Sequence, residues 1–536
     1  MVVRRSPILT NTHQRYATTL TTRADRQTTV IPSEARNVSY LGVFPPSSQS
    51  DRRQFGSSPS RNLLYGIYML TKPENPVVNE RDSSTLLTRA AELAARYVNS
   101  ASERAVAPKE TAVAALQRFH EPFPDSGCDP EKVLAFLDEL GSPATVATTG
   151  GRYFGFVNGG TLPTSLAANW LAGAWDQNAA LRVMSPVAAE LEEIAIRWVC
   201  EALGLPPDSA GGLVTGATMA NFTSLAAARS ALLAREGWNV VEDGLFHAPP
   251  IEVVAGVEVH ASLLKALSLL GLGRKRLNLV EVDEQGRMRA DKLPKLSRNT
   301  IVCIQAGNVN TGAFDPASQI CEAAHQQGAW VHVDGAFGLW AGVSPQYRHL
   351  LNGFEKADSW ATDAHKWPNV SYDCGVAIVR DAEALRTCME LSSAAYLTPG
   401  AKREPMYYTP ECSRRARAVE LWAALKSLGR PGMAELVERT CAHARRFAAG
   451  LRAAGCRVLN DVVINQVLVS FGDSSKTQDV IRSVQEEGTC WCGGTVWQGK
   501  TAMRISVSSW ATTDDDVDRS LEAILRAARI IEAASN

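Results

Sequence analysis

The sequence predicts an α/β protein in which a large domain with a mainly parallel sheet precedes a smaller C-terminal α+β domain. Between roughly residues 185 and 380, short apolar runs alternate with helical patterns, which is typical of a parallel sheet covered by helices on both faces. The run Ile301-Val302-Cys303-Ile304 has no polar alternation, as a strand buried on both faces requires. After about residue 396, long helical patterns surround two separated strands, which indicates the second domain.

The candidate strands of the large sheet share a short apolar run bounded by turn residues. They are Gly212 to Thr215, Ile251 to Ala255, Leu277 to Val280, Ile301 to Gln305, Trp330 to Asp334 and Gly375 to Val379. The two candidate strands of the smaller domain are Val467 to Phe471 and Met503 to Val507.

The N-terminal part of the chain differs in composition from the rest. The first 61 residues carry nine arginines, no lysine and three acids, so we expect a leader without a stable fold. Such a composition is also typical of an organellar transit peptide, but an upstream extension with no role explains it as well and is slightly preferred. Helical spacing begins at Ser83. We therefore expect a leader over 1–82, a helical arm over 83–150, a large domain over 151–395 and a small domain over 396–536.

Composition and charge favour a small-molecule partner. Of 536 residues, 45% are apolar and 21% are charged, as in soluble globular proteins, and no segment reaches the roughly 18 apolar residues of a membrane-spanning helix. A net charge of −1 supplies no long-range field that would attract nucleic acid or anionic lipid. We expect neither nucleic acid nor membrane as a partner.

The cysteine pattern favours a reducing, cytoplasmic location. Eleven cysteines in so long a chain do not resemble a disulfide framework, and no CxxC pair suggests a metal site. Cys490 and Cys492 are better explained as buried free thiols than as a redox pair.

Polar residues at strand ends are the first candidates for a site, because ligands of open parallel sheets bind at the carboxyl ends of the strands. After the first candidate strand, Gly216 turns into a helix expected from about Met219 to Arg235. The free backbone N–H groups of Ala217, Thr218 and Met219, with the Thr218 hydroxyl, would cradle a phosphate. Taken alone, this pattern is better explained as an ordinary helix start.

Three further side chains lie near strand ends. A buried Asp334 needs a cation or donors, and a protonated pyridine nitrogen would be such a partner, although Asp before Gly is common in turns. A partly desolvated Lys366 could attack an aldehyde, although a loop lysine is usually solvated. The ring of His260 could stack on a flat cofactor, although a single histidine is more often structural. Together, the phosphate turn, histidine, aspartate and lysine match what pyridoxal 5'-phosphate (PLP) needs.

At these residues the chain resembles the group II PLP-dependent amino-acid decarboxylases, the family of the aromatic-amino-acid, glutamate and histidine decarboxylases. The resemblance implies PLP-dependent transferase fold type I, which is aspartate-aminotransferase-like. The His365-Lys366 pair is its most specific part. The motifs that carry it are Ser185-Pro186 with Glu190-Leu191-Glu192, Gly216, His260, His332-Val333-Asp334, Tyr347-Arg348-His349-Leu350-Leu351-Asn352-Gly353 and Asp363-Ala364-His365-Lys366-Trp367.

The resemblance also implies residue roles. Lys366 would form the internal aldimine, Asp334 would pair with the pyridine nitrogen, and His260 would stack on the ring. The cofactor-binding residues would be Ala217, Thr218, His260, Asp334, Ala336, Asn308, Asn310, His365 and Lys366. Ala336 would lie under the ring, and Asn308 and Asn310 fall in a segment that approaches the ring and its hydroxyl, although it departs from the threonine-rich version of the aromatic decarboxylases.

Further implied residues concern the substrate. Tyr407 or Tyr408, in the loop of about residues 397 to 413, could donate the proton to the substrate's α-carbon. Phe154, Phe156 and Asn158 correspond to the family's substrate pocket, where aromatic rings would tolerate an apolar substrate or simply pack in the core. Arg504 could favour an acidic substrate or bind the α-carboxylate that all substrates share.

We therefore expect decarboxylation of an L-amino acid to an amine and CO₂ by a homodimer, which is the family's assembly. Two alternatives stay open. One is another PLP reaction on the same fold, such as transamination or an aldehyde-forming oxidative decarboxylation. The other is a PLP-binding protein without turnover.

Overall fold

The computed structural model describes residues 82–390 and 402–535. The predicted leader lies outside the described residues except for Asp82, which begins the first helix, α1 (Asp82–Ser100). Residues 397–401 of the predicted tyrosine loop also lie outside them.

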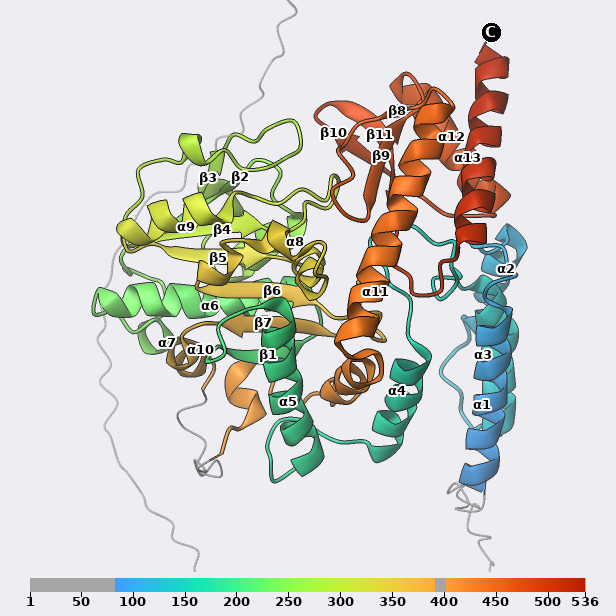
Figure 1. Ribbon diagram of the computed structural model, residues 1–536. Coiled ribbons are helices and arrows are strands. Elements are labelled where there is room, and N and C mark those ends of the chain that lie inside the picture. Colours follow the sequence, from blue (N-terminus) through green and yellow to red (C-terminus); the bar gives the residue numbers. More distant parts are fainter. Residues whose placement is uncertain (1–81, 391–401, 536) are drawn as a thin grey trace, which may run out of the picture. The chain divides into compact units, whose positions relative to one another are not determined.

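A seven-stranded sheet forms the centre of the larger part of the chain (Figure 1). Its strand order is β1-β7-β6-β5-β4-β2-β3. All neighbours are parallel except β7, which runs antiparallel to both β1 and β6. The strands are β1 Ala210–Val214, β2 Glu252–Gly256, β3 Leu277–Val280, β4 Thr300–Gln305, β5 Trp330–Asp334, β6 Ser359–Asp363 and β7 Gly375–Val379. The prediction of a mainly parallel sheet is confirmed.

Helices cover both faces of this sheet, as the apolar strand β4 predicts. Val302 and Ile304 pack in one core cluster with α5 (Pro186–Leu203) and α9 (Ala317–Gln326). Ile301 and Cys303 point to the other face, because successive strand residues alternate. There they meet α6, α8 and α10, whose bounds are Ala217–Arg235, Ala261–Leu269 and Ala382–Met389.

The C-terminal part forms a smaller α+β unit, as predicted. Its antiparallel sheet has the order β10-β11-β9-β8. Four strands form where two were predicted: β8 Arg457–Val458, β9 Gln466–Ser470, β10 Gly493–Trp497 and β11 Lys500–Ser506. The helices are α11 Ala418–Ala453, α12 Ser474–Glu487 and α13 Asp514–Ser535. Helix α11 is kinked at Gly429, where φ is 59°.

Short helices complete the described chain. Those before the large sheet are α2 Glu110–Ala115, α3 Pro130–Ala144 and α4 Pro163–Trp175, and α7 Val240–Asp243 follows α6. The 3-10 helices are η1 Leu116–Phe119, η2 Arg274–Arg276, η3 Ala290–Lys292, η4 Gly338–Val343, η5 Arg348–Leu351, η6 Phe354–Lys356 and η7 Pro405–Tyr408. All described residues belong to one compact unit, so the boundaries near residues 150 and 395 stay predictions.

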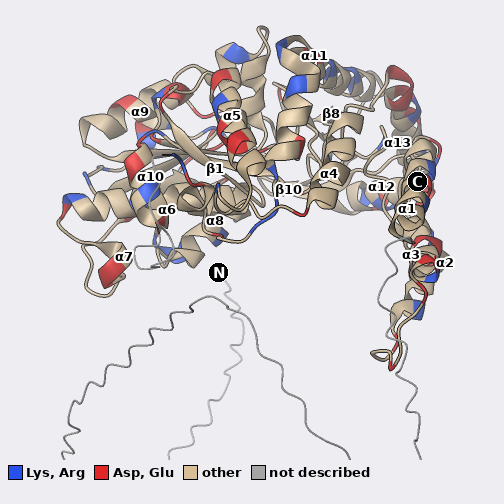
Figure 2. Cartoon of the chain, turned by 90° about the horizontal axis from the view of Figure 1, so that it is seen from below, with Lys and Arg blue, Asp and Glu red and all other residues tan. Residues whose placement is uncertain are grey.

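The surface charge and the helix hydropathy are ordinary. In the view of Figure 2, acidic and basic residues are interspersed along the helices without a face of one sign. None of the helices within residues 82–390 and 402–535 is long and apolar enough to cross a membrane.

Candidate active site

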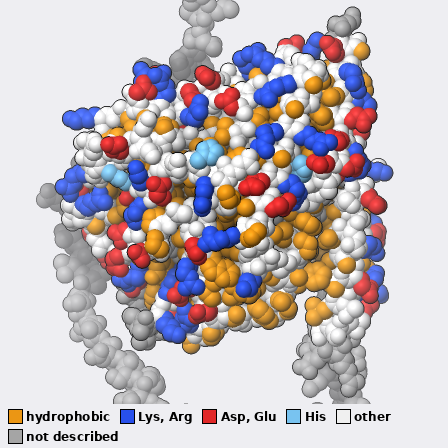
Figure 3. Space-filling view, viewed as in Figure 1, with side chains coloured by type: hydrophobic (Ala, Val, Ile, Leu, Met, Phe, Trp, Pro, Cys, Tyr) orange, Lys and Arg blue, Asp and Glu red, His pale blue; other side chains and the backbone are white. Residues whose placement is uncertain are grey.

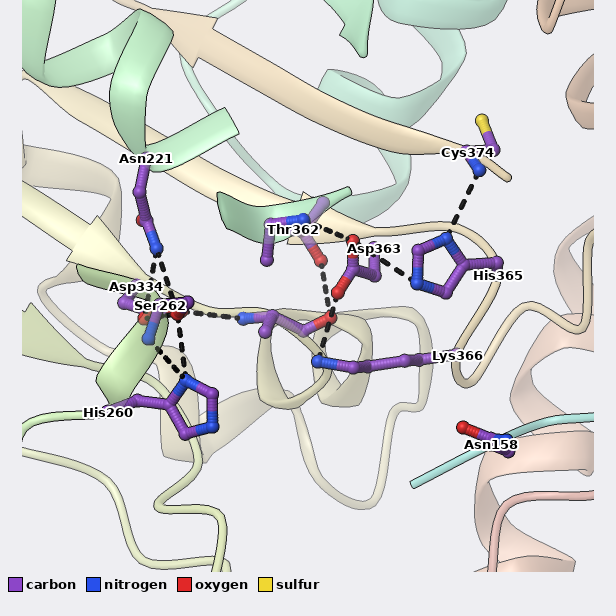
Figure 4. A network of polar contacts seen from close by, with 12 residues as sticks. Asn158, Asn221, His260, Ser262, Asp334, Thr362, Asp363, His365, Lys366 and Cys374 are labelled. Carbon is purple, nitrogen blue, oxygen red and sulfur yellow. Dashed lines mark hydrogen bonds and ion pairs between the residues drawn. The ribbon is translucent and has the colours of Figure 1, made fainter. Parts of the chain in front are cut away.

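The predicted residues Lys366, Asp334 and His260 lie close together at the carboxyl ends of the large sheet (Figure 4). Asp334 is the last residue of β5, and Lys366 follows the end of β6 by three residues. His260 was expected at a strand end; it lies four residues after the end of β2 and is the N-cap of α8. Parallel strands end at one edge of a sheet, and this brings side chains that are far apart in the sequence into one site.

The amine of Lys366 is held by a carboxylate that was not assigned a role from the sequence. Lys366 Nζ lies 2.9 Å from Asp363 Oδ2. The other oxygen, Oδ1, accepts the backbone N–H of Ala217 at 2.6 Å. Helix α6 begins at Ala217, two residues earlier than predicted, and Asp363 therefore occupies the first N–H of a helix N-terminus, where anions are favoured. The half-buried Thr218 lies next to it.

Two glycines allow the backbone to approach this place closely. A Cβ at Gly375 of β7 would collide with the backbone of Gly216, which precedes α6. A Cβ at Gly159 would collide with the carbonyl oxygen of Lys366. The lysine loop and the start of α6 therefore need glycine at positions 159 and 375.

Asp334 is 5% exposed and is surrounded by neutral donors. Its Oδ2 accepts from Asn221 Nδ2 at 3.2 Å and from Ser262 Oγ at 3.4 Å. Its Oδ1 accepts from the backbone N–H of Ala336 at 3.3 Å. Among the ion pairs of residues 82–390 and 402–535, none involves Asp334. A carboxylate in this setting is available to a cation from outside the chain.

The two predicted histidines are held differently. His260 Nδ1 accepts the backbone N–H of Ser262 at 3.2 Å, and burial lowers the pKa of the His260 ring. His365 Nδ1 accepts the backbone N–H of Cys374 at 3.1 Å. Its ring stacks on Tyr372 with 4.3 Å between ring centroids, and burial again lowers the pKa. Both rings are therefore expected to be neutral near pH 7.

The predicted substrate-pocket residues have different surroundings. Phe154 is 1% exposed and packs edge-on against Phe447 of α11, in the core. Phe156 is 61% exposed and stacks on Trp491, a residue that the sequence did not single out. Asn158 accepts a hydrogen bond from the Tyr372 hydroxyl at 2.8 Å.

The two predicted asparagines and Arg504 lie between the large sheet and the small unit. Asn308 Oδ1 accepts the backbone N–H groups of Asn310 and Thr311, so it shapes its own loop. Asn310 Oδ1 accepts from Thr495 at 3.0 Å and from Arg504 Nη1 at 3.3 Å. Arg504 has no acidic partner within ion-pair distance in the described part of the chain.

The predicted tyrosines lie elsewhere. Tyr407 and Tyr408 belong to η7, which packs against β1 and α10. Tyr407 is buried beside Ala180, and Tyr408 lies under the guanidinium of Arg403 at 4.2 Å. The structure does not bring either tyrosine to Lys366 of the same chain.

Comparison with known proteins gives consistent matches. Acidic amino acid decarboxylase GADL1 of Mus musculus is 30% identical over 335 residues, which is 60% of this chain and 60% of that protein. The aromatic-L-amino-acid decarboxylase of Bacillus atrophaeus is 26% identical over 368 residues, covering 66% of this chain and 74% of that protein. The match therefore spans less than two thirds of the mouse relative.

A solved structure with a similar fold and a family model extend the comparison. A crystal structure of Oryza sativa TDC with PLP and tryptamine superposes with a TM-score of 0.78 at 22% identity, covering 85% of this chain and 99% of that one. Residues 142–472 match the model of the pyridoxal-dependent decarboxylase conserved domain. These residues are more than half of the chain, and the chain therefore belongs to the pyridoxal-dependent decarboxylase family.

Proposed function

We propose that this chain is a PLP-dependent decarboxylase that converts an L-amino acid to an amine and CO₂, with the cofactor attached to Lys366. The observation that carries the proposal is the meeting of Lys366, Asp334, His260 and the start of α6 at one sheet edge. Fold alone would not support it, because the same fold serves other reactions.

The residues of this site fit the chemical groups of PLP. An aldehyde needs an amine, and the side chain of Lys366 is 18% exposed and adjoins the start of α6. A protonated ring nitrogen needs a carboxylate, and within the described residues Asp334 pairs with no cation. A phosphate fits a helix N-terminus. Asp363 is the one group that opposes this fit, because its carboxylate already accepts the N–H of Ala217.

The residues then act in a defined way. When bound, PLP would supply an electron sink for the bond between the α-carbon and the α-carboxylate. Asp334 would hold the proton on the ring nitrogen, because its carboxylate is held as an acceptor. His260 offers a neutral, flat ring. Lys366 would hold the cofactor through its side-chain amine.

The proton that replaces CO₂ needs a donor, and Tyr407 and Tyr408 are the tyrosines that the resemblance suggests. Burial raises the pKa of Tyr407, so its hydroxyl stays protonated. Both tyrosines pack away from Lys366 of their own chain. A donor role would therefore have to act across a subunit interface.

A homodimer is supported by exposed apolar side chains. Trp170, Leu171 and Trp175 of α4 are 44%, 54% and 44% exposed. Val183 and Met184, just before α5, are 85% and 49% exposed. Figure 3 shows hydrophobic side chains gathered on this face. An apolar patch of this kind is typical of an interface, and we propose that a second copy covers it. Light scattering tests this assembly.

The substrate class rests on two opposing features. Phe156 with Trp491 favours an apolar side chain, whereas Arg504 without an acidic partner favours an acidic one or binds the α-carboxylate. The matched relatives are named for both acidic and aromatic substrates.

All eleven cysteines are free thiols, which supports a reducing compartment such as the cytoplasm.

The test is an absorbance spectrum with added PLP, borohydride trapping of the lysine adduct, and a screen of L-amino acids for CO₂, amine, aldehyde and keto acid. We expect a trapped adduct on Lys366 and one substrate that yields CO₂ and amine. Lys366→Ala should lose both, and the exposed Lys292→Ala is the control. Keto acid or aldehyde without amine would replace the proposal with transamination or oxidative decarboxylation. Trapping on another lysine would overturn the site.

A further inference from the structure

We propose that His332 is a positioning residue that acts on Asp334 through Asn221. The inference rests on the proposed function, because it concerns the carboxylate assigned to the ring nitrogen. His332 touches neither Lys366 nor Asp334 in the hydrogen bonds of the described residues, and its effect would be indirect.

A chain of hydrogen bonds runs from the far end of β5 to the site. Trp330 Nε1 lies 2.9 Å from Ser359 Oγ, and Ser359 Oγ lies 2.9 Å from His332 Nδ1. His332 Nε2 lies 2.9 Å from Asn221 Oδ1. Asn221 Nδ2 then donates to Asp334 Oδ2 at 3.2 Å. Figure 4 shows the last link, with Asn221 pointing from α6 toward Asp334.

The chemistry of the groups allows only one direction along this chain. The Asp334 carboxylate can only accept, so Asn221 presents its NH₂ group to Asp334 and its Oδ1 to His332. His332 Nε2 must then carry the proton that Asn221 Oδ1 accepts, and in a neutral ring Nδ1 is left as an acceptor. Ser359 therefore donates to His332 Nδ1 and accepts from the Trp330 indole.

Burial keeps this arrangement in place. His332 and Asn221 are both 0% exposed, and burial lowers the pKa of His332 to about 3, so the ring stays neutral. If the Nε2–H were absent, the Asn221 oxygen would be buried without a donor, which is costly. The amide could then turn and place its oxygen against the Asp334 carboxylate. A carboxylate that has lost a donor competes more strongly for a proton, so a ring nitrogen facing Asp334 would hold its own proton less firmly and the charged pair would be weaker.

Two substitutions of His332 separate its hydrogen bond to Ser359 from its hydrogen bond to Asn221. In His332→Gln, the side-chain amide can reach the place of Nε2 and donate to Asn221. In His332→Asn, the shorter amide can reach Ser359 but not Asn221. Asparagine is smaller than glutamine, so a packing defect alone would be larger in His332→Asn, and the control must carry the same substitution at another buried histidine. His443→Asn is the control, because His443 is also a buried histidine (5% exposed) but pairs with Asp514.

The experiment measures dissociation constants by titration for PLP and for its 1-deaza analogue, in which C–H replaces the ring nitrogen. The readout is the ratio of the analogue's constant to that of PLP, so it does not depend on turnover. We expect this ratio to fall roughly tenfold in His332→Asn, because only the nitrogen-bearing ring uses Asp334. His332→Gln should stay within about threefold of the wild-type ratio, and His443→Asn should not change it.

The outcomes distinguish the inference from the proposed function. A ratio that is the same in His332→Asn and His332→Gln, whether both equal the wild type or both fall, would overturn the positioning role. If the wild-type protein binds neither compound, the proposed function itself fails. If His332→Asn does not fold, a ratio in His332→Gln that falls roughly tenfold still refutes the inference, and a retained ratio supports it.

Discussion

Glu192 of α5 is expected to be one of the most costly single side chains to remove from this protein. Its carboxylate is 1% exposed and lies 2.7 Å from the guanidinium of Arg414, which is 2% exposed. Arg403 adds a second contact at 3.3 Å. Both arginines also donate to the backbone of β1, at Leu213 and Gly211. Glu192 therefore holds the segment after residue 401 on the strand that leads to the start of α6.

The cost follows from the two charges left behind. Removing one partner of a buried pair leaves an uncompensated charge, and this typically costs about 3–5 kcal/mol. For Glu192→Ala we expect a loss in this range. The same helix carries a matched control, because Glu201 pairs with Arg430 at 2.6 Å with both side chains more than 60% exposed. An exposed pair contributes roughly 0–1 kcal/mol, so Glu201→Ala should change little.

Thermal unfolding at one protein concentration and one cofactor concentration measures the difference. In a unit of this size, a loss of about 3–5 kcal/mol corresponds to a Tm lower by roughly 3–5 °C, and Glu201→Ala should stay within about 1 °C of the wild type. The double variant Glu192→Leu with Arg414→Met should recover part of the loss, because buried pairs can be replaced by apolar groups. If Glu192→Ala and Glu201→Ala unfold at the same temperature, the assignment of the stabilising free energy to this buried pair is wrong.

Three further predictions concern the site. Asp363→Asn should bind PLP roughly tenfold more tightly, because a negative charge leaves the helix N-terminus and Lys366 loses its ion pair; equal or weaker binding in a titration contradicts this. Gly159→Ala should lose PLP binding in the same assay because its methyl group would collide with the lysine loop, whereas Gly173→Ala, whose Cβ meets nothing within 4 Å, should keep it. Burial lowers the pKa of His332 to about 3, so below about pH 6.5 the unfolded chain gains a proton that the folded chain does not. The free energy of unfolding therefore decreases as the pH is lowered from about 6.5 toward 3. Between pH 7.5 and 5, denaturant unfolding should show roughly 2 kcal/mol more loss in the wild type than in His332→Gln, and parallel curves would refute the pKa shift.

The sequence could predict that Asp334 and His260 lie near strand ends, because apolar runs that form strands precede both of them. Lys366 was also expected near a strand end, but the candidate strands did not include β6, because Ser359–Asp363 contains polar side chains within a fully buried strand. Ser359 is tolerated there because it bonds to Trp330 and His332 on the adjacent strand. Such partners are 27 and 29 residues apart, and local patterns do not reveal them.

The aromatic pair in the predicted pocket shows the same limit. Phe154 and Phe156 share a side of any regular strand, so alternation predicts equal burial. In the structure Phe154 is 1% exposed and Phe156 is 61% exposed. The backbone turns at Phe156 and Val157, where the φ values are 53° and 62°. Non-glycine residues rarely adopt such values, and the turn signals of this segment, Gly155 and Asn158-Gly159-Gly160, lie on either side of these two residues and not at them.

The two carboxylates of the site differ in whether their charge is balanced, so the two ends of the site favour groups of different charge. They end adjacent parallel strands, β5 and β6, yet Asp363 has its charge matched by Lys366 and by the N-terminus of α6. In the described part of the protein, Asp334 has only neutral donors, and one of them, Asn221, is held by His332. A buried anion without a cation costs free energy that a cationic ligand can recover. The site therefore favours a ligand whose positive end reaches Asp334. An anion at the start of α6 is disfavoured as long as the Asp363 carboxylate accepts the N–H of Ala217. PLP has a positive ring nitrogen and a negative phosphate, so this chain is expected to bind the ring end strongly and the phosphate end against an internal competitor.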